Sequence, residues 1–336
     1  MPEAVNWRGA LARVALVLGA ALLAGCAGTS PPPIAIGSPQ AKKAGDSLVA
    51  FANTPFPYSG AIPETGKPFL DVNADGRLGH TSPRGGVYWQ DETYSDRRVL
   101  LAIPKSFDIH APGALVVFFH GNQATLERDV LNRQQVPAQV AASGLNAVVV
   151  APQFAVDALD SSAGNFWTPG SFHAFLDETS RRLANAYGGG AAAARAFARL
   201  PVILVVYSGG YYPAAYSLGT AGSRVRGVIL FDGVYGNEDK FASWIEDNRS
   251  RAFFFSAYSQ SSKDSNDKIR ALLDADHVAY SQGEPDSLAP GVVSFLDAGQ
   301  NLNHLDFVTQ AWTSDPLKEI LSRVIFGRAE PKVASR

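Results

Sequence analysis

The sequence has few of the features that stabilise a protein by anything other than its hydrophobic core. Among its 336 residues there is one cysteine, Cys26, so an intrachain disulfide is excluded. It lacks the G-x-G-x-x-G pattern of nucleotide sites and the lysine motif of phosphate loops. No cluster of His, Cys and Asp has the spacing of a transition-metal site. We therefore expect a fold held by its core and a function that needs no cofactor or metal.

Charge is also sparse and nearly balanced. The chain has 29 Lys and Arg against 31 Asp and Glu, which gives a net charge of −2. Proteins that bind nucleic acids usually carry a basic stripe, and no long block of like charge is present here, so we expect no nucleic-acid partner. In contrast, 46% of the residues are hydrophobic. That content is ample for one large α/β domain.

The N-terminal residues have the pattern of an export signal. Arg8 and Arg13 flank a short apolar stretch at 14–22, which is too short to cross a bilayer core of about 30 Å as a helix. The next residues, Leu23-Ala24-Gly25-Cys26, resemble the lipobox of bacterial lipoproteins. This resemblance implies a signal peptide at 1–25 and acylation of Cys26. An ordinary signal peptide with a chance cysteine, or a membrane anchor helix, are the alternatives.

The same resemblance suggests where the protein resides. Ala27 follows the cysteine, and in enterobacterial lipoproteins a residue other than Asp there resembles an outer-membrane address. We expect a lipid anchor on Cys26 that holds the protein in the cell envelope, at the outer membrane facing the periplasm. Residues 26–46 are rich in Pro, Gly and Ser and form a linker, 47–329 form the domain, and 330–336 form a tail.

Continuous apolar runs alternate with helical patterns along the domain. Such runs, which indicate strands buried on both faces of a parallel sheet, lie at 114–119, 146–151, 202–206, 228–231, 252–256 and 292–296. Helices are expected at 138–143, 171–187 and 316–326, each followed by a glycine. The alternation predicts an α/β fold, a mostly parallel sheet with helices on both faces. Residues 86–102 predict a leading antiparallel hairpin.

The pentapeptide Val206-Tyr207-Ser208-Gly209-Gly210 stands between a strand and a helix. It follows the apolar run 201–205 and precedes a helix start at Tyr211. A strand, a sharp turn with a serine among small residues, and a helix form the layout of a nucleophile elbow. The turn projects the hydroxyl, and the amides of the following helix can face a developing oxyanion. Ser208 is therefore the candidate nucleophile of a serine hydrolase.

A candidate acid and base follow later in the chain. Asp232 ends the buried run 228–231, and His304 lies in a loop after the last apolar run. The carboxyl ends of parallel strands are where such sheets place catalytic groups. The order Ser208, Asp232, His304 matches the order of the Ser, acid and His in α/β-hydrolases. His304 would then be the general base and Asp232 would orient it.

At these residues the chain resembles the α/β-hydrolase superfamily, over about 86–327. The segments 207–211 and 231–236 look like those of a poorly characterised bacterial group with a Ser-Gly-Gly-Tyr elbow. Two positions depart from that pattern, because Val206 stands where glycine is usual and Tyr207 where His is often found. Many members carry the acid after the next strand, so Asp264 and Asp267 are alternatives to Asp232. Asp267 could instead cap a helix that starts near Lys268.

The resemblance also implies an oxyanion hole and a pocket. His120-Gly121 ends an apolar strand, and the backbone amide of Asn122 or Gln123 would donate to the oxyanion together with that of Gly209. Aromatic and polar side chains near these segments are the candidate lining of a substrate pocket, namely His120, Tyr207, Tyr211 and Trp167.

The expected activity is hydrolysis of a small-molecule or lipid-like carboxylic ester through an acyl-enzyme on Ser208. An amidase or peptidase on the same scaffold is the second hypothesis, because both reactions use the same triad. A non-catalytic, hydrolase-like envelope protein that binds a ligand is the third. Residues 71–76 resemble the start of a calcium loop, but position twelve is Ser82 rather than an acid, so an Asx turn is the better interpretation.

Overall fold

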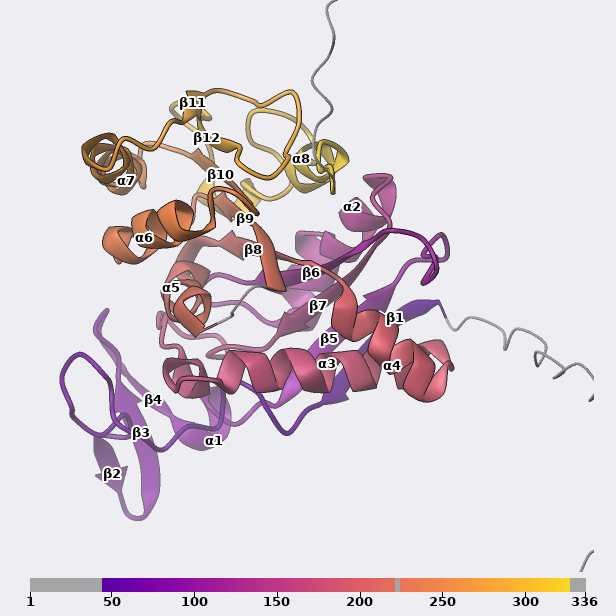
Figure 1. Cartoon of the computed structure of the whole chain (residues 1–336). Coiled ribbons are helices and arrows are strands. Elements are labelled where there is room, and N and C mark those ends of the chain that lie inside the picture. The colour runs from indigo at the N-terminus through magenta and orange to yellow at the C-terminus, as the bar shows by residue number, and fades with distance from the viewer. Residues whose placement is uncertain (1–43, 221–223, 327–336) are drawn as a thin grey trace, which may run out of the picture. The chain divides into compact units, whose positions relative to one another are not determined.

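A computed structural model describes residues 44–220 and 224–326 of the chain. The proposed signal peptide, Cys26, most of the linker and the tail 330–336 lie outside the described residues. The central element is a nine-stranded sheet with the order β1-β5-β7-β6-β8-β9-β10-β12-β11 (Figure 1). Strands β1, β5 and β7 are antiparallel neighbours, and every pairing from β7 onward to β11 is parallel.

This strand order, with an antiparallel pair leading a parallel run, is that of the α/β-hydrolase fold, as the sequence predicted. The sheet strands are β1 (Gly45–Ala50), β5 (Arg98–Ile103), β6 (Ala114–Phe119), β7 (Ala147–Pro152), β8 (Val202–Tyr207), β9 (Val225–Phe231), β10 (Phe253–Tyr258), β11 (Ser281–Gln282) and β12 (Val293–Asp297). The expected apolar runs all became strands of this sheet, because strands covered on both faces contain few polar residues.

The expected pairing within residues 86–102 is wrong in its detail. Strand β4 (Val87–Trp89) joins β2 (Val72–Ala74) and β3 (Arg77–Thr81) in a separate three-stranded antiparallel sheet. Strand β5 instead pairs with β1 and β7. Between β4 and β5 the chain forms the short helix α1 (Gln90–Thr93), whose first turn carries two acidic residues that favour a helix N-terminus. The leading antiparallel pair of the large sheet is therefore β1 with β5.

Helices cover both faces of the large sheet. Their bounds are η1 (Leu126–Arg133), α2 (Val136–Ala142), η2 (Gly164–Trp167), α3 (Ser171–Tyr187), α4 (Gly190–Arg199), η3 (Ser208–Gly210), α5 (Tyr211–Thr220), α6 (Glu238–Asn248), α7 (Lys263–Ala275), η5 (His304–Asp306) and α8 (Pro316–Ser322). Among the described residues, no helix is both long and apolar enough to span a bilayer.

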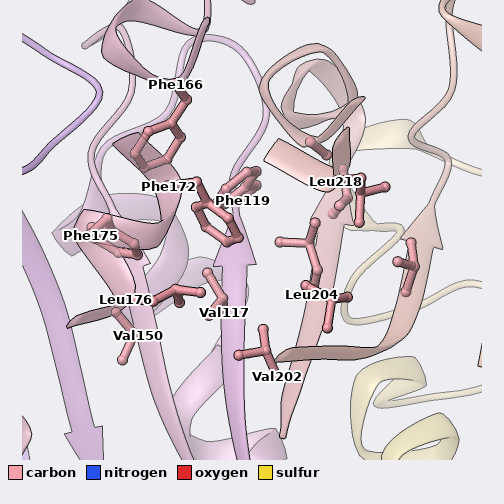
Figure 2. Close-up of a cluster of buried hydrophobic side chains, with 14 of the residues drawn as sticks. Val117, Phe119, Val150, Phe166, Phe172, Phe175, Leu176, Val202, Leu204 and Leu218 are labelled. Carbon is pink, nitrogen blue, oxygen red and sulfur yellow. The ribbon is translucent and has the colours of Figure 1, made fainter. Parts of the chain in front are cut away.

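Two hydrophobic clusters lie on opposite faces of the sheet, because successive residues of a strand point to opposite sides. Along β8, Val202, Leu204 and Val206 belong to the cluster that includes residues of α3 to α7. Ile203, Val205 and Tyr207 belong to the other cluster, under η1, α2 and α8. Figure 2 shows part of the first cluster, where Phe172 of α3 lies beside Phe119 of β6 and Phe175 lies on the side of Val150 of β7.

The region that resembled a calcium loop is the turn between β2 and β3. Asp75 and Gly76 both have positive φ, 52° and 87°, as a two-residue hairpin turn requires. The amide of Gly76 donates to Asn73 Oδ1 at 2.9 Å, so an asparagine side chain braces the turn.

Candidate active site

The elbow has the strained geometry that its sequence predicts. Strand β8 ends at Tyr207, Ser208 has φ of +51°, and helix α5 begins three residues later. Positive φ is costly for a residue with a side chain and persists only where the surroundings enforce it. Val206, which replaces the usual glycine, is fully buried in the core beneath the turn. Its bulk is therefore accommodated by the sheet.

Small residues let the loop after β6 and the elbow after β8 meet at Ser208. A Cβ added to Gly121 would lie 2.8 Å from Ser208 Cβ, so the loop after β6 touches the elbow directly. A Cβ on Gly210 would lie 2.7 Å from the carbonyl oxygen of Phe119. Only glycine permits approaches this close. The close loop expected from Gly121 is thus present.

The candidate serine, histidine and aspartate form one hydrogen-bonded chain. His304 Nε2 lies 2.7 Å from Ser208 Oγ, and His304 Nδ1 lies 2.7 Å from Asp232 Oδ2. Nδ1 carries the proton because it faces a carboxylate, which leaves the lone pair on Nε2 for the serine hydroxyl. His304 is in η5, after β12, and its side chain is 36% exposed. The three residues come from the carboxyl ends of β8, β9 and β12.

Asp232 is buried and strongly hydrogen-bonded. Its Oδ1 accepts from the Ser259 amide at 3.0 Å and from the Ser262 hydroxyl, and its Oδ2 accepts from the hydroxyls of Ser259 and Ser261, each at 2.9 Å. Burial alone would raise the pKa of Asp232, but the hydrogen bonds from His304, Ser262 and the Ser259 amide outweigh it and hold the pKa well below its usual value. The carboxylate stays ionised beside His304. The sequence did not predict this serine cluster.

The alternative acids do not reach His304. Asp264 is exposed in the first turn of α7. Asp267 lies inside α7, where it pairs with Lys263 at 2.6 Å and with Arg270. Its hydrogen bond with Lys263 lowers its pKa. Because α7 begins at Lys263, the expectation that Asp267 caps a helix near Lys268 is also wrong.

Tyr207 supports His304 and does not line the cavity beside the elbow. Its ring stacks on the imidazole with a centroid distance of 5.1 Å, and its hydroxyl donates to the His304 carbonyl oxygen at 2.7 Å. The side chain is buried, which raises its pKa. Tyr207 belongs to the hydrophobic cluster on the face of the sheet that α2 and α8 cover. The pocket role expected from its position beside Ser208 is therefore wrong.

His120 is likewise a structural residue. Its Nδ1 lies 2.8 Å from the Gly121 carbonyl oxygen, and its Nε2 accepts from the Phe154 amide at 2.9 Å. The ring is buried, and desolvation lowers its pKa to about 4. A neutral imidazole thus ties the loop after β6 to the loop after β7. His120 was a candidate for lining a substrate pocket, but its ring does not line the cavity beside the elbow.

The structure excludes one of the three candidate oxyanion donors and leaves the other two. The Gln123 amide donates to the Ala158 carbonyl oxygen at 2.8 Å, so it is occupied and the expectation for Gln123 is wrong. Gly209 and Asn122 remain as candidates. The Asn122 side chain packs on Gly209, since a Cβ on Gly209 would lie 2.2 Å from Asn122 Oδ1. That oxygen accepts from the Ser161 hydroxyl at 3.0 Å.

A cavity of about 180 Å³ opens beside the elbow. Two of the candidate pocket residues, Tyr211 and Trp167, line it together with Ile62, Tyr212, His80 and Asp160. His80 is buried on β3. No local sequence signal marks His80 or Asp160, because the three-stranded sheet and the loop after β7 bring them together only in the fold.

Within the part of the chain that the structure describes, no group of three or more His, Cys, Asp and Glu side chains could hold a metal ion. Ser208 and His304 place a candidate nucleophile within hydrogen-bonding distance of a candidate base, and Asp232 lies on the other side of that base.

Comparisons with known proteins add the following. No family model and no curated protein matches the sequence. Among solved structures, a feruloyl esterase module from Clostridium thermocellum is similar at 14% identity and a TM-score of 0.47, covering 82% of this chain and 99% of its own. An S-formylglutathione hydrolase from Agrobacterium tumefaciens follows at 13% identity and 0.43, covering 75% and 97%. A fluorophosphonate-binding serine hydrolase from Staphylococcus aureus has 11% identity and 0.42, covering 73% and 95%.

Proposed function

We propose that this protein is a serine hydrolase that cleaves small carboxylic esters through an acyl-enzyme on Ser208. The observation that carries the proposal is the unbroken hydrogen-bonded chain from Ser208 through His304 to Asp232. Together with the strained elbow that presents Ser208, this arrangement meets the requirements of nucleophilic catalysis.

In the first half-reaction Ser208 Oγ attacks the ester carbonyl carbon, and His304 Nε2 takes the hydroxyl proton. The oxyanion forms beside the Gly209 amide and Asn122. Asp232 stabilises the imidazolium, which then gives its proton to the departing alcohol oxygen. In the second half-reaction His304 takes a proton from water, the hydroxide attacks the acyl carbon, and Ser208 regains its proton as the acid leaves.

The test compares purified full-length protein with its Ser208→Ala variant. We expect the wild type to be labelled by a fluorophosphonate and to hydrolyse short nitrophenyl esters. We expect the variant to lose the label and about 10⁶-fold in kcat, because the nucleophile is gone. Ser47→Ala, an exposed serine on β1, is the matched control and should retain both signals.

The outcomes separate the alternatives. Faster turnover of the matched anilides than of the esters would favour an amidase or peptidase. A well-folded wild type that is neither labelled nor active would refute the enzyme and favour a binding protein on the same scaffold.

We also propose that the enzyme works in the cell envelope, held to a membrane by a lipid on Cys26. The support for this is the lipobox-like sequence that ends at Cys26, together with the Pro-, Gly- and Ser-rich residues that follow.

A further inference from the structure

The carboxylate of Asp232 is surrounded by hydrogen-bond donors besides His304. Three residues of the loop after β10 form a serine cluster around it, namely Ser259, Ser261 and Ser262. Asp232 Oδ1 accepts from the Ser259 amide and the Ser262 hydroxyl. Its Oδ2 accepts from the hydroxyls of Ser259 and Ser261 and also from His304 Nδ1. An ionised carboxylate offers about four lone-pair sites, so the cluster and His304 together occupy all of them.

Ser262 donates to Asp232 instead of capping the helix that it precedes. It is the N-cap residue of α7, a position where a serine side chain ordinarily accepts from an amide of the first turn. Ser262 makes no such bond, and its hydroxyl donates to Asp232 Oδ1. The residue is only 1% exposed. This hydroxyl therefore contributes to the environment of the acid rather than to the end of the helix.

The same region of the chain holds the backbone of Asp232 in a costly conformation. Its φ is +43°, in the left-handed region that a residue with a side chain rarely adopts. Its amide donates to the Ala257 carbonyl oxygen at 2.8 Å, and Ser259 bonds its carboxylate through both amide and hydroxyl. Strained conformations persist only where the surroundings enforce them, and here β10 and the serine cluster do so.

The hydrogen bonds extend through Ser261 to Tyr235. Ser261 donates to Asp232 Oδ2 at 2.9 Å, so the Tyr235 hydroxyl, 2.9 Å from Ser261 Oγ, is the donor of that pair. Burial raises the pKa of Tyr235, which keeps its proton. Bonds in such a chain polarise one another. Although Ser261 is exposed, a donor behind it thus favours the orientation that points its hydroxyl at the carboxylate.

Donors on a carboxylate lessen its attraction for a neighbouring cation. A negative charge beside His304 favours the protonated imidazole, and hydrogen bonds to the ionised acid spread that charge over the donors. Each hydroxyl of the serine cluster therefore favours ionised Asp232 and makes protonation of His304 less favourable. A protonated His304 has no lone pair on Nε2 and cannot accept the Ser208 proton. The donors on Asp232 thus affect the pH below which the base is lost.

Other ionisable groups act at the same place but stay constant when a serine is changed. Those that act on the pair of Asp232 and His304, or on the tyrosines against it, are Tyr207, Tyr235, Arg84, Arg133 and Asp306. Arg133 donates to the Leu305 carbonyl oxygen at 3.0 Å. Removal of one serine hydroxyl leaves all of these groups present, so a comparison with the wild type isolates the effect of that hydroxyl.

We propose that the serine cluster weakens the hold of Asp232 on protonated His304 and thereby keeps the enzyme active further into mild acid. The three serines act through Asp232 and are positioning residues. The inference rests on the proposed ester hydrolysis at Ser208 and adds the pH range over which that site works.

The test is the pH dependence of kcat/KM for nitrophenyl acetate with the full-length protein. The acidic limb of this profile reports protonation of the base. Ser262→Ala removes a buried hydroxyl and leaves no polar atom in its place. We expect the midpoint of the limb to rise by about 0.5 to 1 pH unit, a loss of about three- to tenfold in kcat/KM on the limb, because Asp232 then attracts the imidazolium more strongly.

Two further variants remove the other hydroxyls. Ser259→Ala keeps the amide that donates to Asp232 Oδ1 and should move the midpoint in the same direction as Ser262→Ala. Ser261→Ala changes an exposed residue and is the least disruptive to folding. Its shift should have the same sign but be smaller, because water can replace part of the lost bond.

Ser265→Ala is the matched control. Ser265 lies in the first turn of α7, and its hydroxyl donates to Glu238 Oε1 at 2.8 Å rather than to Asp232. This variant should keep the wild-type midpoint. Fluorophosphonate titration at each pH gives the concentration of competent Ser208, so rates are compared per active site and partial unfolding does not imitate a shift.

The outcomes distinguish this inference from the function on which it rests. An unchanged midpoint in both Ser259→Ala and Ser262→Ala, or a midpoint that moves to lower pH, would overturn the inference and leave the esterase intact. A lower plateau rate without movement of the midpoint would also overturn it, because that pattern reports only a misplaced Asp232. An equal shift in Ser265→Ala would do the same. A wild type that is neither labelled nor active at any pH would instead refute the hydrolase itself.

Discussion

Two histidines near the elbow behave differently because their Nε2 atoms meet different partners. The Nε2 lone pair of His120 is occupied by the Phe154 amide, which leaves it no acceptor role in a reaction. The Nε2 atom of His304 faces the Ser208 hydroxyl, and its Nδ1 faces Asp232. The hydrogen-bond partners of each histidine, rather than its residue type, therefore determine whether it can act as a base at this edge of the sheet.

We predict that His120 makes the protein less stable in mild acid. Its pKa is about 4 in the fold and about 6.5 in an unfolded chain, so the unfolded state binds more protons between these values. The free energy of unfolding should therefore fall by roughly 3 kcal/mol as the pH drops from about 6.5 to 4. Urea unfolding at a series of pH values measures this slope.

A His120→Asn variant is expected to lose most of that slope, although it is less stable at pH 7 because the bond from Phe154 is perturbed. His173→Asn, at an exposed site, should keep it. An undiminished slope in His120→Asn would contradict the assignment of a buried neutral imidazole.

Asp232 is predicted to be the acid on which turnover depends. Asp232→Asn should lower kcat by about 10⁴-fold, because an amide no longer fixes the Nδ1–H tautomer of His304 or stabilises the imidazolium. Asp264→Asn and Asp267→Asn should stay within about twofold of the wild type, since neither carboxylate reaches His304. Steady-state kinetics with a short nitrophenyl ester decides between them, and a loss confined to Asp264→Asn would reverse the assignment.

At the scale of elements, the site depends on how closely the loop after β6 approaches the elbow after β8. We predict that Gly121→Ala lowers kcat by about 10²-fold. Its methyl group would meet Ser208 Cβ at 2.8 Å and displace the hydroxyl from His304, and displacements near 1 Å have costs of this size. Gly219→Ala in α5 is the matched control, because a Cβ there meets nothing within 4 Å.

Kinetics and thermal unfolding separate the two possible causes of a loss in Gly121→Ala. A lower kcat per fluorophosphonate-titrated site supports the close approach. Full activity per site in a variant that is merely less stable would show that the loop can yield without moving Ser208.

The parallel strands were predictable because burial on both faces leaves a local signal, a run of apolar residues such as 114–119. The order Ser208, Asp232, His304 also followed from sequence, since the carboxyl ends of parallel strands meet at one edge. The pairing of 86–102 was not predictable, because a polar segment between two apolar ones fits either a hairpin turn or the helix α1. Adjacency in sequence gave a wrong prediction for Tyr207. It directly precedes Ser208, but its side chain contacts His304 and does not line the cavity.

At the scale of the whole described unit, the candidate reactive groups follow strands of the large sheet, and other segments line the cavity beside the elbow. Ser208, Asp232 and His304 follow strands of the large sheet, whereas His80 lies on β3 of the three-stranded sheet. Such contacts between distant segments leave no periodic pattern in sequence, which is why the pocket was only partly predicted.

The lipid anchor is the prediction that concerns the whole chain. Cys26 lies outside the described residues and is the only cysteine, so one substitution removes every thiol. In a Gram-negative host we expect the wild type to incorporate an alkyne analogue of palmitate and to sediment with membranes. Cys26→Ser should lose the label and remain in the supernatant, because each buried CH₂ of the acyl chains contributes about 0.8 kcal/mol to membrane binding.

Ala27 gives the sharper test, because it separates lipidation from sorting. If Cys26 is acylated and the residue after it acts as an address, Ala27→Asp should keep the palmitate label but move the protein from outer-membrane to inner-membrane fractions of a density gradient. Fluorophosphonate labelling of Ser208 in each fraction follows the folded enzyme rather than fragments. A wild type without the lipid label would refute the anchor, whereas a labelled Ala27→Asp variant that stays in the outer membrane would refute only the address. The anchor and the reaction at Ser208 can thus fail independently of each other.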